Sequence, residues 1–238
     1  MRSRTTSSPA CGICSVAEGK GAFAPVRRPG SLAAKRGIDI LGGTVAVVLS
    51  SPLWLIAVIG IPLASRGPLF YRAMRVGRGG RVFGMYKFRS MHVAGEGTGS
   101  AITAPGDPRI FGFGRFLRAS KIDELPQVIN LLRGDISFVG PRPEDPGIVE
   151  RFYDDDLRET LSLTPGLTSE GTLYFFDEFE ATVSAEDTEQ SYADTILRPK
   201  LVRDMAYERR ATIWTDLSLI FRTGGRVLAH LARRRWNG

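Results

Sequence analysis

The stretch ILGGTVAVVLSSPLWLIAVIGIPLAS, residues 40–65, contains no charged residue and decides how the rest of the chain is placed. As a straight helix its 26 residues would extend ~39 Å, which is enough to cross a hydrocarbon core about 30 Å thick. Ser51 and Pro52 interrupt the stretch near its centre, and proline removes one helical hydrogen bond, so we expect a kink there. Each limb is then too short to cross, which predicts a re-entrant helix-break-helix.

Basic residues flank this stretch on both sides, and positive charge near a membrane segment favours the cytoplasmic side. The flanking residues are Arg27, Arg28, Lys35 and Arg36 before it, and Arg66, Arg72, Arg75 and Arg78 after it. Both ends of the stretch are therefore expected on the same, cytoplasmic side of the membrane. A conventional transmembrane span and a buried helix of a soluble domain are the two alternatives.

The chain divides into four parts, and the fold class we predict is α+β, membrane-associated and mainly helical, with a small β-hairpin. Residues 1–32 are rich in Ser, Pro, Gly and Arg and predict a disordered tail. The re-entrant helix occupies 33–66, and a cytoplasmic domain occupies 67–197. Residues 198–238 mix apolar side chains and Trp with arginines, which predicts amphipathic helices at the membrane interface. Packing on the domain, or an exposed basic helix, is the alternative for this last part.

Local patterns place the main elements of the cytoplasmic domain. Residues 68–72 and 81–88 predict two strands joined by a glycine-rich turn, and the spacing of those glycines matches no nucleotide-binding loop. Residues 110–132 predict helix around a break, with Ser120 as the N-cap of the second half. Residues 138–143 predict a short strand that runs into a stiff loop. A break at 224–225 is expected in the C-terminal helical region, whereas 173–195 show no clear pattern.

The charge of the chain is positive and unevenly distributed. Its formal net charge is +7, and residues 66–118 carry ten Lys and Arg against two acidic residues. Beside an apolar stretch, such a charge favours anionic lipid or a phosphorylated substrate as the partner. Cys11 and Cys14 are the only cysteines, too few for a zinc site or a disulfide framework, and we assign them no role.

The adjacent carboxylates of Asp123 and Glu124 are the candidate reactive groups, because an unusual number of cations surrounds them in sequence. These cations are Lys87, Arg89, Arg115, Arg118, Lys121, Arg133 and Arg142. Gathering so many cations is costly unless an anion joins them, and phosphates suit arginine forks. Two carboxylates could hold Mg²⁺ together with phosphate oxygens. Nearby arginines are expected to lower the carboxylate pKa values and keep an aspartate ionised as a nucleophile. The acidic pair would also repel a nucleic-acid backbone, so we expect no nucleic-acid partner.

Four motifs in order resemble the bacterial sugar transferases, the monotopic phosphoglycosyl transferases that act on undecaprenyl phosphate. They are KRGID (35–39) before the apolar stretch with its central Ser51-Pro52, YKFRSM (86–91), KIDELPQ (121–127) and GDISFVGPRP (134–143). The resemblance covers residues 33–170 and 198–225. It implies a UDP-sugar donor, a polyprenyl phosphate acceptor, Mg²⁺, and a bacterial enzyme on the cytoplasmic face of the inner membrane.

The resemblance also implies roles for individual residues. Asp123 is expected to be the nucleophile and Glu124 the metal ligand, which makes 67–197 the catalytic domain. Arg118 is expected to bind phosphate, and the loop Pro141-Arg142-Pro143 is expected to form the uridine site. The implied reaction transfers a sugar-1-phosphate with release of UMP, through an aspartyl-phosphosugar intermediate, and begins a membrane-linked glycan such as an exopolysaccharide.

Some features of the chain depart from the family pattern or leave alternatives open. After Pro165-Gly166-Leu167-Thr168 the sequence continues as Ser169-Glu170-Gly171-Thr172, where the family usually has a Gly and then a Gln. The chain resembles the minimal form of the family, without the several N-terminal spans of larger members. The sugar, the pathway and the oligomeric state, including a homo-oligomer, stay open. A catalytically inactive membrane scaffold of the same fold is the alternative function.

Overall fold

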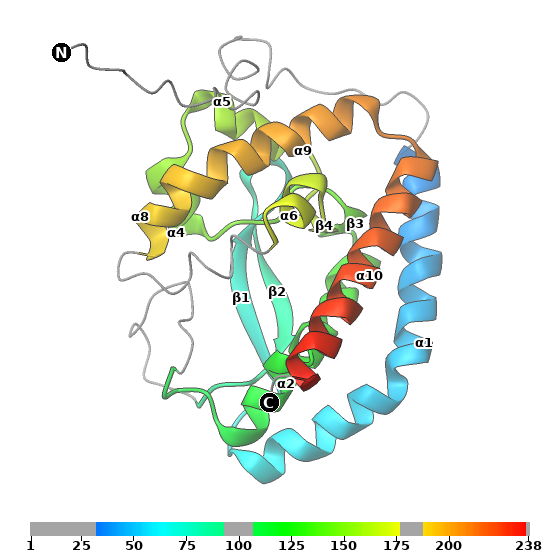
Figure 1. Cartoon of the computed structure of the whole chain (residues 1–238), viewed down its shortest axis with the longest axis vertical. Coiled ribbons are helices and arrows are strands. Elements are labelled where there is room, and N and C mark those ends of the chain that lie inside the picture. Colours follow the sequence, from blue (N-terminus) through cyan, green and yellow to red (C-terminus); the bar gives the residue numbers. More distant parts are fainter. Residues whose placement is uncertain (1–31, 93–106, 177–187, 237–238) are drawn as a thin grey trace, which may run out of the picture.

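A computed structural model describes residues 32–92, 107–176 and 188–236 of the chain. These residues are mostly helical, with a small two-stranded hairpin and one long apolar helix near the N-terminus, as expected for an α+β membrane-associated protein. Cys11, Cys14, nearly all of the predicted tail and residues 177–187 lie outside the described ranges. Figure 1 shows the hairpin β1–β2 in the middle of the molecule, with α9 across one end and α1 and α10 along one side.

The elements follow one another as α1 Leu32–Ala64, β1 Phe70–Val76, η2 Arg78–Gly80, β2 Val82–Phe88, α2 Gly112–Ala119, η3 Ile122–Glu124, α3 Gln127–Arg133, β3 Ser137–Val139, α4 Pro146–Phe152, α5 Asp155–Arg158, η4 Glu159–Ser162, β4 Gly166–Thr168, α6 Glu170–Tyr174, α8 Thr188–Tyr192, η5 Ala193–Leu197, α9 Arg198–Arg210 and α10 Ile213–Trp236.

The apolar stretch lies within α1, a continuous helix of 33 residues that contains Pro52. Figure 1 shows that α1 bends between its blue N-terminal half and its cyan C-terminal half. Pro52 cannot donate a hydrogen bond to the carbonyl of Val48, and the Ser51 hydroxyl donates to that carbonyl instead, at 2.8 Å. The predicted break is therefore a bend with its backbone acceptor satisfied, and the helix continues through it.

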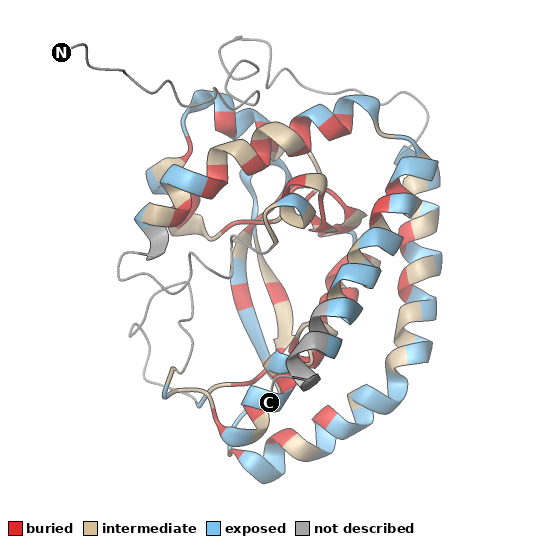
Figure 2. Ribbon diagram, in the orientation of Figure 1, coloured by how far each residue is buried: buried red, intermediate tan, exposed pale blue. Residues whose placement is uncertain are grey.

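Both limbs of α1 pack on the same domain. In the N-terminal limb, Gly43 lies against the side chains of Leu131 and Leu132. In the C-terminal limb, Ala57 and Ile61 are fully buried in a cluster around Phe88 and Leu117. The outward side of α1 exposes large apolar side chains, and Figure 2 shows this side as mostly pale blue. They include Leu41, Val45, Val48, Leu49, Leu55, Ile59 and Leu63.

Polar contacts also fasten each end of α1 to the domain. Near the N-terminal end, the Asp39 carboxylate accepts hydrogen bonds from the Ser137 hydroxyl and the Phe138 N–H, both at 3.0 Å. At the C-terminal end, the Ser65 hydroxyl and carbonyl accept from the Arg89 guanidinium at 2.9 and 2.6 Å. Both ends of the apolar helix therefore lie against one and the same globular body.

The two predicted strands form the antiparallel hairpin β1–β2, which confirms the hairpin, although β1 runs on to Val76. Asn130 on α3 is fully buried and fixes one edge of this hairpin. Its side-chain oxygen accepts from the Tyr86 N–H at 2.9 Å, and its amide donates to the Gly84 carbonyl at 3.0 Å. The edge strand β2 is thereby held against the helix that follows the acidic pair.

Two local expectations were wrong, and one strand pairing was not foreseen. Ser120 is the C-cap of α2, not an N-cap, and its hydroxyl donates to the Phe116 carbonyl at 2.7 Å. No break occurs at Gly224-Gly225, because α10 runs through both glycines. The short strand β3 pairs in parallel with β4, which the sequence did not predict. This pairing brings two backbones close together, since a Cβ on Gly140 would lie 2.3 Å from the Thr164 carbonyl oxygen.

Candidate active site

The acidic pair Asp123-Glu124 lies in the short turn η3, between two helices that anchor it. Ile122 is buried in the cluster that holds the C-terminal limb of α1, and Val128 belongs to the cluster that holds the N-terminal limb. Lys121, just before the turn, adopts a left-handed conformation with φ of 58°. Such a conformation is costly for a residue with a side chain and occurs often at functional sites. This residue separates the end of α2 from the turn that carries the acidic pair.

The Asp123 side chain is buried but incompletely hydrogen-bonded. Its exposed fraction is 6%. Its Oδ1 atom has no hydrogen-bond partner among the described residues. An unpaired buried acceptor costs free energy in the isolated protein, and a ligand that supplies a donor or a cation recovers that cost.

The Glu124 side chain is a third exposed and lies between two cations. Its Oε1 atom accepts a hydrogen bond from the Lys87 ammonium at 3.1 Å and lies 4.0 Å from the Arg142 guanidinium. Lys87 comes from β2 and Arg142 from the loop after β3. Two segments far apart in sequence thus converge on this carboxylate, as we expected for both cations.

The two neighbouring carboxylates differ in their affinity for protons. Burial, and secondly the negative charge of Glu124, raises the pKa of Asp123 to about 6. Lys87, with further help from Arg142 and Lys121, holds the pKa of Glu124 well below its usual range. The expectation that nearby arginines lower both pKa values was wrong for Asp123, because desolvation outweighs the attraction of the cations there.

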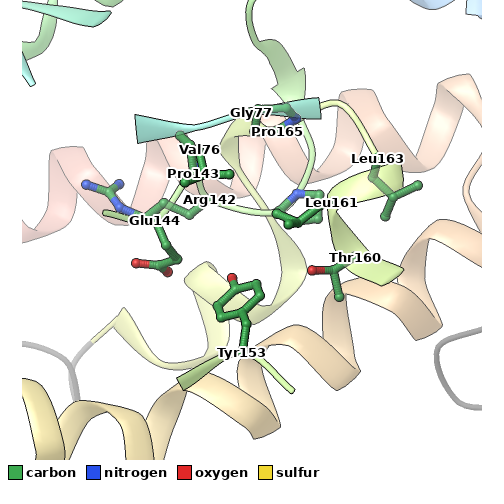
Figure 3. Close-up of a pocket in the computed structure, with 11 residues that line it drawn as sticks. Val76, Gly77, Arg142, Pro143, Glu144, Tyr153, Thr160, Leu161, Leu163 and Pro165 are labelled. Carbon is green, nitrogen blue, oxygen red and sulfur yellow. The ribbon is translucent and has the colours of Figure 1, made fainter. Parts of the chain in front are cut away.

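Arg118, on the last turn of α2, is half-buried and close enough to lower the pKa of Asp123. Among the described residues it has no hydrogen bond or ion pair, so its guanidinium is available for an anion. The Pro141-Arg142-Pro143 loop follows β3 and lines a pocket with Tyr153, Thr160 and Pro165, shown in Figure 3. Both prolines are buried and hold the loop, while the Arg142 side chain is 40% exposed.

Arg89 was expected to bind substrate, but its guanidinium is hydrogen-bonded within the protein. The residue is only 4% exposed. Its guanidinium donates to Pro68 O at 2.6 Å, to Arg66 O at 3.0 Å and to both oxygens of Ser65. Its hydrogen-bonding capacity serves the junction between α1 and β1. Strand β2 ends at Phe88, so the alternation that would place Arg89 beside Lys87 no longer applies.

Asp123 and Glu124 could hold the Mg²⁺ that the sequence analysis expects. Mg²⁺ takes one or two protein carboxylates and completes its shell with phosphate oxygens and water. No cluster of three or more potential metal ligands occurs among the described residues. Lys87 engages one oxygen of Glu124. The other carboxylate oxygen of Glu124 and the unpaired Oδ1 of Asp123 are hard oxygen ligands of the kind that Mg²⁺ prefers.

Fold and site together place a cation-flanked pair of carboxylates beside a long apolar helix. The family model for bacterial sugar transferases matches residues 30–230, and the chain belongs to this family. The predicted family membership is therefore confirmed.

Individual relatives carry informative names. The chain is 36% identical to a UDP-N-acetylgalactosamine-undecaprenyl-phosphate N-acetylgalactosaminephosphotransferase of Aeromonas hydrophila, over 84% of this chain and 45% of the relative. It is 34% identical to a UDP-glucose:undecaprenyl-phosphate glucose-1-phosphate transferase of Caulobacter vibrioides, over 79% of this chain and 67% of the relative. It is 32% identical to an undecaprenyl-phosphate galactose phosphotransferase of Salmonella typhimurium, over 82% of this chain and 40% of the relative. The chain therefore spans less than half of two of these relatives.

Three buried residues of the site region escaped the sequence reasoning: Asn130, Glu144 and Lys200. Asn130 lies six residues after Glu124, in a helix where its neighbours in sequence are mostly apolar. Glu144 and Lys200 form an ion pair across 56 positions of sequence. No local pattern signals a pair at that separation, although the Pro-Arg-Pro-Glu run could have drawn attention to Glu144.

Proposed function

We propose that this protein transfers a sugar-1-phosphate from a UDP-sugar to undecaprenyl phosphate, with release of UMP, and so begins a membrane-linked glycan. The observation that carries the proposal is the buried, incompletely bonded Asp123 beside a Glu124 that Lys87 and Arg142 hold. Relatives named for this reaction support the donor and acceptor classes. Their sugars differ, so the identity of the sugar does not follow from the family.

In the first step, a carboxylate oxygen of Asp123 attacks the β-phosphorus of the UDP-sugar. The bond from that phosphorus to the bridging oxygen breaks, and UMP leaves with the electron pair. Arg118 and Arg142 would bind the phosphate oxygens and keep the reacting atoms in line. Glu124 would hold Mg²⁺, which would supply positive charge that offsets the charge of the transferred group.

In the second step, a phosphate oxygen of the lipid attacks the same phosphorus and frees the Asp123 carboxylate. Direct attack of lipid phosphate on the UDP-sugar would need three partners aligned at the interface at once. A covalent intermediate on Asp123 divides that task into two simpler displacements. Lys87 keeps Glu124 ionised throughout, because it pairs with the carboxylate and lowers its pKa.

The proposal includes a re-entrant α1 at the cytoplasmic face of the inner membrane. A spanning helix would separate its two ends by the bilayer, whereas Asp39 and Ser65 both bind the same domain. The exposed apolar side of the bend would enter the near leaflet. Cysteines at positions 32 and 68, in a chain without Cys11 and Cys14, should both resist a membrane-impermeant thiol reagent in intact cells. Labelling of one position alone would establish a span.

The C-terminal helix α10 would lie in the headgroup layer. Trp214, Phe221 and Leu228 are exposed on it, and their spacing of seven residues places them on one stripe of the helix. An exposed apolar stripe with a tryptophan, on a helix rich in arginine, suits the membrane interface. Substitution of the three by Ser should release the protein from liposomes more readily without loss of folding.

The central test supplies detergent-solubilised protein with undecaprenyl phosphate, Mg²⁺ and a panel of UDP-sugars, and follows UMP. One or a few donors should give steady release that depends on the lipid. A folded, membrane-bound protein that releases UMP from no donor would contradict the enzyme and favour the inactive scaffold.

A further inference from the structure

A buried polar cluster lies directly behind the Pro141-Arg142-Pro143 loop. Glu144 Oε1 accepts hydrogen bonds from the Lys200 ammonium at 2.5 Å and from the Tyr192 hydroxyl at 2.6 Å. The Lys200 ammonium also donates to the Tyr192 hydroxyl. Glu144, Lys200 and Tyr192 are 9%, 4% and 3% exposed, so the cluster is shielded from water.

Tyr192 at the end of α8 and Lys200 in α9 are separated by a π-helical turn, and both side chains reach Glu144. In a regular α-helix, residues eight apart point ~80° away from each other and are separated by ~12 Å of rise. The π turn η5, Ala193–Leu197, lies between them and is wider than an α turn. π turns are rare and often occur at functional sites. Here the turn places a hydroxyl and an ammonium on one carboxylate oxygen.

Burial of two charges is expensive, and packing alone does not explain it. An apolar pair of similar volume often stabilises a fold as well as a buried ion pair does. The Glu144 backbone is already held, because its carbonyl accepts from the Val76 N–H at 2.9 Å. The backbone of the loop is therefore attached to β1 independently of the ion pair.

The position of Glu144 suggests a role for Lys200. Arg142, two residues earlier, has its guanidinium 4.0 Å from Glu124, and its positive charge also helps to lower the pKa of Glu144. Figure 3 shows the Arg142 guanidinium and the Glu144 carboxylate leaving the loop on the same side. Burial alone would raise the pKa of Glu144, but Lys200, Tyr192 and Arg142 hold it below its usual range. Glu144 is therefore a negative charge that attracts the arginine expected to bind substrate.

We infer that Lys200 is a positioning residue, which neutralises Glu144 so that Arg142 stays directed toward Glu124 and the phosphates of the bound nucleotide. This inference rests on the proposed function, and it adds residues of α8 and α9 to the donor site. Without Lys200, the Glu144 carboxylate would compete with the substrate phosphate for the Arg142 guanidinium.

The test measures the affinity of UMP for the full-length protein by calorimetry in the presence of Mg²⁺, together with thermal unfolding. Lys200→Met should weaken UMP binding about tenfold, because it leaves Glu144 free to pair with Arg142. The double variant Glu144→Gln/Lys200→Met should recover binding to within about threefold of wild type, since the competitor is also gone. Arg198→Met is the matched control: it removes a cation from the same turn of α9, which pairs at the surface with Asp154. Its UMP affinity should equal that of wild type.

A merely structural role makes the opposite prediction for the double variant, which would then bind UMP as weakly as Lys200→Met or more weakly. That result overturns the inference, as does wild-type affinity in Lys200→Met. If Lys200→Met does not fold, the double variant must fold and bind UMP, and its failure to do either also overturns the inference. Absence of UMP binding by the wild-type protein would count against the proposed function itself.

Discussion

Asp39 and Asp123 are buried to nearly the same extent, 5% and 6% exposed, but their surroundings differ. Asp39 joins α1 to the domain, and the Ser137 hydroxyl and the Phe138 N–H satisfy its Oδ1 atom. Asp123 lies in the turn η3, its Oδ1 atom has no partner among the described residues, and its pKa is raised to about 6. One aspartate stabilises the fold, whereas the other is kept at a cost to stability.

The same contrast separates two arginines that looked alike in the sequence. Arg89 is buried and its donors are used by backbone and serine oxygens at the end of α1. Arg142 is 40% exposed and only approaches Glu124. Residues whose polar groups are satisfied within the protein belong to the structure, while unsatisfied ones at the dyad are candidates for chemistry.

The largest expected effect is that of Asp123→Asn. With a UDP-sugar and Mg²⁺ but no lipid, wild type should release no more than about one equivalent of UMP and gain the mass of a phosphosugar. The variant should do neither, and its turnover should fall at least ~1,000-fold because the nucleophile is lost. Its thermal stability above pH 7 should not decrease, since a buried charge is removed. Asp39→Asn is the matched control, expected to lose stability but to keep its activity per folded molecule.

Turnover of Asp123→Asn above about one per cent of wild type would show that Asp123 is not an obligatory nucleophile. The acidic pair Asp123-Glu124 would then act as a general base in a single displacement. The comparison between the two aspartates would also fail if Asp39→Asn lost activity without any loss of folded protein.

Arg89→Met tests the structural side of the comparison. It leaves several carbonyls at the end of α1 without donors, and the free energy of unfolding should fall by about 3 kcal/mol. Denaturant unfolding in detergent measures this loss. The affinity of the remaining folded protein for UMP should match that of wild type. Weakened UMP binding at unchanged stability would return Arg89 to the substrate site, where the sequence had placed it.

Arg142→Ala should impair turnover but leave stability nearly unchanged, the reverse of what is expected for Arg89→Met. Turnover should fall about 30-fold, because a cation that binds phosphate is lost, while thermal unfolding stays within a few degrees of wild type. Arg118→Ala should behave in the same way. Arg142→Lys should recover only part of the activity, since an ammonium cannot form the two parallel hydrogen bonds of a guanidinium. Steady-state UMP release and thermal unfolding distinguish this outcome from a loss of folded protein.

Three features were predictable because each depends on a continuous stretch of sequence: the acidic pair, the hairpin and the kinked helix. Asp123-Glu124 needs no long-range information, and the Ser51-Pro52 step in an apolar stretch indicates a bend by itself. The expectation that Lys87 and Arg142 surround the acidic pair also agrees with the structure, although it came from crowding in sequence and not from geometry.

The features that the sequence did not reveal depend on contacts between distant segments. Arg89 lies two residues after Lys87, and only the carbonyls at the end of α1 explain why it turns inward. The raised pKa of Asp123 follows from burial, which sequence neighbours do not report. Gly224 and Gly225 cost a helix only about 1 kcal/mol each. Packing of α10 against β3 and β4 offsets that cost, and Thr223 also hydrogen-bonds Thr168.

The smallest expected effect is a pH dependence that distinguishes Asp123 from an ordinary aspartate. Asp123 must be ionised to attack, and its pKa of about 6 means that kcat/KM should fall about tenfold between pH 7 and pH 5. An aspartate with an unshifted pKa would show almost no fall over that range. Because the pKa is raised in the folded state, the stability contribution of Asp123 is present below pH 4 and is lost as pH rises through about 6. Lys87→Met should move the fall in kcat/KM to higher pH, since Lys87 favours the ionised form. A flat profile down to pH 4.5 would mean that Asp123 is as well solvated as a surface aspartate, and its contrast with Asp39 would then carry no chemical meaning.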